Sequence, residues 1–169
     1  MSNLLERLET AGQVVTVQMD EVRFVAFNQL QAIGTRNLNS CSVVIVASSL
    51  GAVFAHIPPL PYVTNDPFAG DNHVQQMMDQ VQTLVSSQRS HGYFPQSESL
   101  LICAVYQGDR ALPSQMAIMQ QALTVFGVAP IIRTYSVPTN LQNPAQGTVV
   151  VLAQNSQQPL VYIEDILQS

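Results

Sequence analysis

The sequence LLICAVY at Leu100–Tyr106 is an uninterrupted apolar run of strand length. A run without polar alternation is typical of a strand that is buried on both faces near the centre of a sheet. Apolar residues at helical spacing flank it over His73–Ser90 and Pro113–Phe126, and a further strand is expected at Ile131–Val137. The residues expected to be mostly buried are Leu101, Cys103, Val105, Ile118, Leu123, Phe126, Val150 and Leu152.

Shorter strands are expected around this unit. Those in the N-terminal half are Val14–Gln18, Val22–Phe27, Ser42–Ala47 and Ala52–Ile57, the last two joined by a hairpin turn at residues 48–51. A short helix is expected at residues 2–10 and a closing hairpin at 148–153 and 160–164, whereas 34–40 and 58–72 are expected to be irregular. This order predicts one α/β (α+β layered) domain over residues 1–169, with mixed sheets and two main helices packed outside.

Composition excludes several classes of function. All six basic residues are arginine, which excludes Schiff-base lysine chemistry and a P-loop lysine. A net charge of −5 without a basic cluster argues against nucleic acid or an anionic membrane as a partner. No apolar run approaches the roughly 18 residues of a membrane span, and the N-terminus lacks the apolar stretch of a secretory signal. A cytoplasmic protein is expected, and its two cysteines are too few for a disulfide framework.

Cys41 and His56 form the first candidate site. A cysteine becomes a strong nucleophile as its thiolate, and a nearby imidazole is a common way to stabilise that form. If the two strands pair about Leu50, Cys41 faces residues 55–59, which brings His56 within side-chain reach. The alternative is a buried cysteine at a strand start beside a half-buried histidine.

A second candidate site contains Asp66, Asp71 and His73, which could ligate a divalent metal. The same residues also arise from ordinary turn and helix-cap chemistry, in which Asp71 or Asn72 would be the N-cap of the next helix. Cys103 lies inside the apolar run and is expected to be inert.

The segment TRNLNSC at residues 35–41, followed by AHIPPLP at 55–61, resembles the CheD family of chemoreceptor glutamine deamidases. That family opens its site with T-x-G-L-G-S-C, and its next strand carries a histidine followed by L-P. The matching residues here are Thr35, Leu38, Ser40, Cys41, His56, Leu60 and Pro61. The family's middle helix, central strand and closing hairpin have counterparts in the same order, so the resemblance implies a CheD-like sandwich over most of the chain.

The chain departs from the family pattern in its turn and in one loop. Asn37 and Asn39 replace both glycines of the turn, and asparagine is the next most tolerant residue for left-handed backbone. The family's glycine-rich, arginine-containing loop is replaced by residues 136–147. Since loops around a rigid site select the substrate, this chain resembles a diverged relative.

The resemblance implies a cysteine-dependent deamidase that needs no metal or other cofactor. Cys41 would attack a side-chain carboxamide, and His56 would deliver a proton to the departing ammonia. Thr35 would orient His56, while Ser40 and Asn39 would shape the turn and contribute backbone oxyanion donors. The same arrangement is similar to that of the cytotoxic necrotizing factor toxins, which deamidate glutamine in host proteins.

The expected partner is a protein substrate with an accessible glutamine. Asn37, Asp66 and Asp71 are the candidate residues of a substrate-binding loop. Two alternatives remain open: a catalytically silent CheD-like binding module, and a different thiol amidohydrolase or transamidase that acts on a small amide. Assembly of several copies of the chain also remains open.

Overall fold

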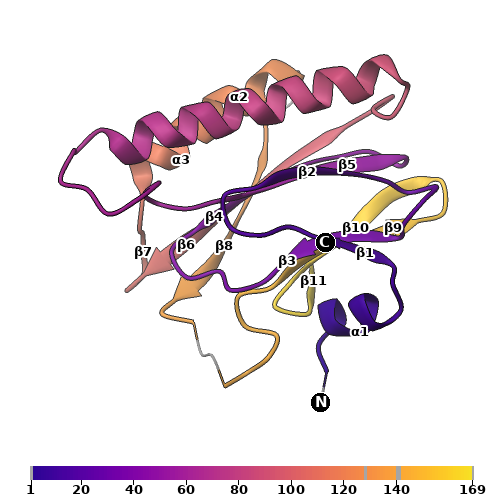
Figure 1. Ribbon diagram of the computed structural model, residues 1–169, viewed down its shortest axis with the longest axis horizontal. Coiled ribbons are helices and arrows are strands. Elements are labelled where there is room, and N and C mark those ends of the chain that lie inside the picture. Colours follow the sequence, from indigo (N-terminus) through magenta and orange to yellow (C-terminus); the bar gives the residue numbers. More distant parts are fainter. Residues whose placement is uncertain (1, 128, 140–141, 169) are drawn as a thin grey trace.

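The elements stack in layers in the order helices, sheet, sheet, helix (Figure 1). This arrangement is seen in a computed structural model that describes residues 2–127, 129–139 and 142–168. It confirms the predicted α+β layered sandwich with mixed sheets and two main helices outside. No helix in these ranges has the length and hydropathy needed to cross a membrane.

One sheet has an internal β-hairpin at its centre and antiparallel neighbours around it. Within the described residues it is six-stranded, in the order β2-β5-β4-β6-β7, and β8 pairs in parallel with β6. β6 therefore lies between β4 and β8, which confirms the internal position predicted for LLICAVY. The strands are β2 Val22–Ala26, β4 Ser42–Ala47, β5 Gly51–Ile57, β6 Glu98–Tyr106, β7 Asp109–Arg110 and β8 Ile131–Val137.

The other sheet joins strands from both ends of the chain. In the described part of the chain it is five-stranded, in the order β1-β3-β9-β10-β11, and β1 pairs in parallel with β3. The strands are β1 Val14–Thr16, β3 Ala32–Thr35, β9 Val149–Gln154, β10 Gln157–Ile163 and β11 Ile166–Gln168. β1 and β2 are close in sequence but belong to different sheets, so the chain crosses between the layers near residue 20.

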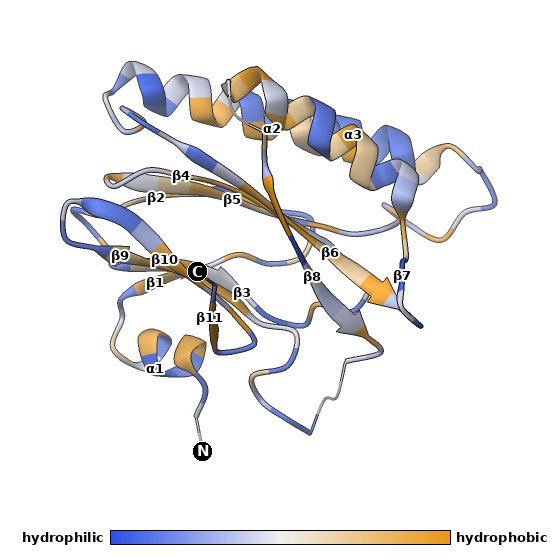
Figure 2. Ribbon diagram, turned by 180° about the vertical axis from the view of Figure 1, so that it is seen from behind, coloured by the Kyte–Doolittle hydropathy of each residue, from blue (hydrophilic) through white to orange (hydrophobic). Residues whose placement is uncertain are grey.

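Helices cover the outer faces of both sheets. The long helix α2 (Ala69–Ser90) and helix α3 (Pro113–Leu123), which ends in a 3₁₀ turn at Thr124–Phe126, pack on the six-stranded sheet. The short helix α1 (Leu4–Thr10) packs on the five-stranded sheet through Leu5. Figure 2 shows apolar residues concentrated along the strands between these layers, whereas the helices carry polar residues as well.

The strongest apolar runs are buried, as predicted, with differences at the strand and helix ends. Leu101, Cys103, Leu123 and Val150 are buried. Four other residues of the predicted set are only half-buried, namely Val105, Ile118, Phe126 and Leu152. Val105 and Phe126 lie near the ends of their elements, whereas Ile118 and Leu152 lie inside theirs.

Helix α2 begins four residues earlier than the predicted start at His73. Its N-cap is Phe68, so the prediction of Asp71 or Asn72 as the cap is wrong. Asp66 accepts a hydrogen bond from the Phe68 backbone N–H at 2.9 Å. Gly70 allows the first turn to approach Pro59 closely, because a Cβ there would lie 2.6 Å from the Pro59 carbonyl oxygen.

Strand β3 (Ala32–Thr35) was not predicted, since residues 34–40 read as irregular. Its partners are β1 in parallel and β9, which is more than a hundred residues away, in antiparallel orientation. A strand this short, with a glycine inside, has weak local signals, and its pairing is non-local. β10 also starts before the predicted Leu160, because the strand passes through Pro159 at a register shift.

Gly34 is predicted to be required where β3 meets β9. A Cβ at this position would lie 2.7 Å from the Val149 carbonyl oxygen, which is backbone and can move only with the sheet. Gly34→Ala should therefore lower the free energy of unfolding by about 1–3 kcal/mol, as overpacking does elsewhere. Urea denaturation measures this, with Gly12→Asn as the control, since a Cβ built on Gly12 meets no atom within 4 Å and asparagine tolerates its φ of 68°. Equal stability of the two variants would contradict the prediction.

Candidate active site

Cys41 and His56 share the face of the six-stranded sheet that looks toward the other sheet. In the β4–β5 register Val43 lies opposite His56, and Cys41 precedes Val43 by two residues. Cys41 and Val43 both belong to the core between the sheets. Residues two apart on a strand point to the same side, and such diagonal neighbours across two strands are about 7–8 Å apart at Cα. The expected placement of Cys41 and His56 on one face is therefore observed.

Thr35 reaches His56 from the facing sheet. Its hydroxyl donates a hydrogen bond to the Val17 carbonyl oxygen at 2.6 Å and lies 2.7 Å from Nδ1 of His56. Because the single hydroxyl proton is directed at a carbonyl, which only accepts, Nδ1–H must be the donor to Thr35. Thr35 and its partner His56 are 0% and 1% exposed, so this bond is shielded from water.

The other ring nitrogen of His56 is unpaired. With the proton on Nδ1, Nε2 carries a lone pair, and it is buried without a hydrogen-bond partner among the described residues. The expected bond between the Cys41 thiol and this nitrogen is thus not formed in the structure. A buried acceptor without a partner is uncommon and is a feature of sites where strain or chemistry retains it.

Burial keeps both groups of the pair neutral at pH 7. It lowers the pKa of His56 to about 4, and it raises the pKa of the Cys41 thiol. A backbone hydrogen bond from Asn39 partly opposes the second effect, because an N–H directed at the sulfur favours the thiolate. The resting site is therefore a thiol beside a neutral imidazole.

The turn before Cys41 uses left-handed backbone at only one of the two residues that the sequence suggested. Asn37 has φ 64°, as its replacement of a glycine predicts, and Ser40 has φ 84°. Asn39 does not have a positive φ. The Leu38 amide, which donates to the Gly147 carbonyl at 3.0 Å, anchors the turn to the start of β9. Side chains of Asn37 and Asn39 are exposed, so both can face a ligand.

Tyr135 of β8 is a site residue that the sequence did not reveal. Its hydroxyl donates a 2.6 Å hydrogen bond to the carbonyl oxygen of Cys41. Burial raises the pKa of Tyr135, so the hydroxyl remains a donor, although the Ser40 backbone partly opposes this rise. The only sequence signal was a tyrosine inside an apolar strand, 94 residues from its partner.

The side chains of Asp66, Asp71 and His73 each contact a different residue and do not form one site. His73 Nε2 lies 2.5 Å from a carboxylate oxygen of Asp20, and Asp71 accepts a 3.3 Å hydrogen bond from Ser114. Asp66 is exposed and holds the turn before α2. No group of three potential metal ligands occurs in the described ranges. The hypothesis of a metal site therefore has no geometric support, while Asp66 and Asp71 stay predictions as substrate-loop residues.

Cys103 lies on the opposite face of the same sheet from Cys41. It packs in the core beneath α2 and α3, and burial raises its pKa to about 11. A thiol with that pKa is almost entirely protonated at neutral pH. Cys41 is thus the cysteine that the fold places beside a histidine.

Comparison with known protein-family models and with curated protein sequences finds no match for this chain. Assignment of a function must therefore come from the arrangement of its residues.

His56 is predicted to make the fold sensitive to acid. The unfolded chain binds a proton at the ordinary histidine pKa of about 6.5, whereas the folded chain does so only near pH 4. The stability contributed by neutral His56 is therefore complete above pH 6.5 and is lost as pH falls from there toward 4. The loss should reach about 3 kcal/mol.

Urea denaturation between pH 7.5 and 4.5 measures this effect. His56→Asn should show a shallower fall in stability than the wild type, because its side chain does not titrate. His91→Asn is the matched control, since His91 is exposed, and it should follow the wild type. Parallel curves for wild type and His56→Asn would refute the assignment of acid sensitivity to this ring.

Proposed function

We propose that this protein is a cysteine-dependent amidohydrolase of the glutamine deamidase type, related to the CheD family, with Cys41 as nucleophile. The observation that carries the proposal is the hydrogen bond between Thr35 and Nδ1 of His56. It fixes the tautomer that a general base needs, with a free lone pair on Nε2. The sequence resemblance predicts this contact, and an ordinary buried histidine would have no need of an unpaired nitrogen.

The first half of the reaction forms a thioester. His56 Nε2 takes the proton of the Cys41 thiol as the sulfur attacks the carboxamide carbon of a glutamine side chain. The C–N bond of the resulting tetrahedral intermediate then breaks, and the same proton passes from His56 to the leaving nitrogen, which departs as ammonia.

The second half restores the enzyme. His56 removes a proton from a water molecule, which attacks the thioester carbon, and the C–S bond breaks as the sulfur regains that proton. The net change is carboxamide plus water to carboxylic acid plus ammonia, so no cofactor is consumed. Thr35 acts throughout as a positioning residue, because it holds the ring by the nitrogen that does not exchange protons.

The substrate would have to bring its amide to the turn at residues 37–40. Cys41 is 5% exposed, so a glutamine side chain must enter between the turn and the sheet. A neutral thiol and imidazole are compatible with this route, since proton transfer can coincide with attack and no ion pair need exist beforehand. Exclusion of water by the docked substrate would strengthen every hydrogen bond to the developing oxyanion.

A catalytically silent binding module is the second candidate, and burial of the site favours it. The pKa of the Cys41 thiol is raised, and the thiol makes no hydrogen bond to His56 among the described residues. In this alternative the exposed turn would recognise a protein without transforming it. Iodoacetamide labelling separates the two candidates, because an activated site should alkylate Cys41 well ahead of Cys103 in native protein.

Deamidation itself is tested by mass spectrometry. Wild-type protein and Cys41→Ala are incubated with cell extract proteins, and peptides are searched for glutamine-to-glutamate conversion, with released ammonia measured in parallel. Conversions that need Cys41 support the proposal. Identical peptide sets with both proteins, together with slow labelling of Cys41, would favour the binding module.

Variants of Thr35 are predicted to distinguish the contribution of its hydroxyl group to activity from that of its methyl group. Thr35→Ser keeps the oxygen and should retain most activity, whereas Thr35→Val should lower kcat on the order of 10²-fold. Thr35→Val should also cost about 1–3 kcal/mol of stability, because it leaves the Val17 carbonyl buried without a donor. Ser40→Ala should lose less activity than Thr35→Val.

The kcat is measured on a glutamine peptide that the wild-type protein deamidates, and the stability is measured by urea denaturation. Each kcat is compared at a temperature where the variant remains folded. Equal losses for Thr35→Ser and Thr35→Val would show that packing, not the hydroxyl, matters at this position.

A further inference from the structure

A cavity lies at the opposite end of the sandwich from Cys41. It has a volume of about 690 Å³ and is bounded by the β4–β5 turn, the β9–β10 turn, the segment after β2 and the segment after α2. Cys41 precedes β4 and Ser49 follows it, so the two sites are roughly 25 Å apart along the strand. The volume falls within the roughly 300–1,000 Å³ that is usual for small-molecule sites.

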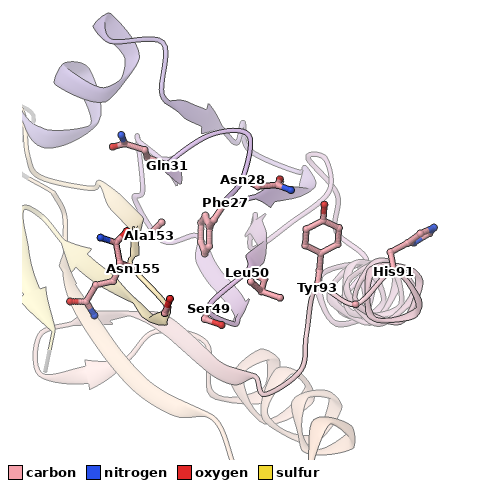
Figure 3. A pocket seen from close by; sticks show the side chains of 12 residues that line it. Phe27, Asn28, Gln31, Ser49, Leu50, His91, Tyr93, Ala153 and Asn155 are labelled. Atoms are coloured by element: carbon pink, nitrogen blue, oxygen red, sulfur yellow. The ribbon is translucent and has the colours of Figure 1, made fainter.

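The lining of this cavity is polar but uncharged. None of the described residues that line it is aspartate, glutamate or arginine, and its only titratable members are Tyr93 and His91. In Figure 3 the ring of His91 lies at the edge and is turned away from the other side chains. A charged ligand would lose its hydration here without gaining a counter-charge, which is unfavourable. The lining therefore fits a neutral ligand.

Two aromatic rings and a leucine provide the apolar part of the cavity. Phe27 and Tyr93 stand on either side of Leu50 in Figure 3. The Tyr93 ring is held edge-on against Phe24, with centroids 5.2 Å apart, and its backbone oxygen accepts a hydrogen bond from Ser48. The Phe27 amide donates to the Leu50 carbonyl at 2.9 Å. These surfaces are thus positioned before any ligand arrives, which lowers the entropic cost of binding.

Carboxamides provide the polar part. Asn28, Gln31 and Asn155 line the cavity, and no side-chain hydrogen bond joins them to another described residue. Each carboxamide offers donors and an acceptor close together. Hydroxyl groups on adjacent carbons of a sugar both donate and accept hydrogen bonds, so they can pair with such a carboxamide. The C–H face of a sugar ring can pack against an aromatic ring.

We propose that this cavity is a binding site for an uncharged saccharide of two or three units, which lies against Phe27 and Tyr93 and is hydrogen-bonded by Gln31 and Asn155. The site is independent of the proposed chemistry at Cys41. It would give the protein a second contact, either with a glycan or with a glycosylated partner, both of which present the same sugar chemistry.

The test uses a glycan array that carries neutral, sialylated and sulfated oligosaccharides, with adenosine and uridine titrated separately by NMR. Wild-type protein should bind neutral glycans and shift the side-chain amide signals of Gln31 and Asn155. The double variant Gln31→Ala/Asn155→Ala should bind at least about tenfold more weakly, as expected for the loss of two hydrogen bonds.

Matched controls make each outcome decisive. Gln31 and Asn155 are exposed, so the double variant should keep the wild-type Tm, and Gln76→Ala removes an exposed carboxamide elsewhere and should bind like the wild type. Cys41→Ala should also bind normally, so loss of deamidation leaves this proposal standing. No binding of neutral glycans, binding confined to anionic glycans or nucleosides, or equal binding by the double variant would overturn it. Preference for free oligosaccharide over glycoprotein would identify the source of the sugar.

Discussion

Burial of the β4–β5 hairpin on both faces is the constraint on which the rest of the structure depends. Val43 and Ile45 enter the core between the sheets, whereas Val44 and Val46 enter the core under α2 and α3. Each such side chain contributes about 1.5–3 kcal/mol by burial, and a slip of one residue would exchange the two sets. Because a slip would also move His56 to the helix side, the same packing that stabilises the domain fixes the face of the candidate site.

The sequence revealed this hairpin because its signals are local. β4 was predicted at its observed bounds, and the pairing about Leu50 placed Cys41 and His56 correctly on one face. β3 escaped prediction because four residues with a glycine carry little signal, and its partner β9 lies far along the chain. The Tyr135 contact was missed for the same reason. The role of Thr35 was predicted only from the resemblance of its motif, since the hydrophobic pattern within one strand carries no information about contacts with a strand of the other sheet.

Electrostatics at the site follow from its position between sheets. A location with almost no water access disfavours both thiolate and imidazolium, which explains the raised pKa of Cys41 and the lowered pKa of His56. The Thr35 hydroxyl compensates only one ring nitrogen. Nε2 is therefore buried without a hydrogen bond, which costs about 1–3 kcal/mol of stability. This cost is understandable if the Cys41 thiol or a substrate forms a hydrogen bond to Nε2 during the reaction.

The two ends of the sandwich differ in a way that the strand direction explains. At the Cys41 end, the turn at residues 37–40 is tied back by the bond of Leu38 to Gly147, and the loop after β5 by the bond of Gln115 to Pro59, so the reactive groups stay buried. At the Leu50 end, both sheets finish in tight hairpins whose short turns cannot cover the gap between the layers. A recess bounded by turns follows, and turns are rich in asparagine and serine for reasons of backbone geometry. The polar side chains that line the recess are thus explained in part by the turns themselves. The aromatic rings of Phe27 and Tyr93 are not required by turn geometry.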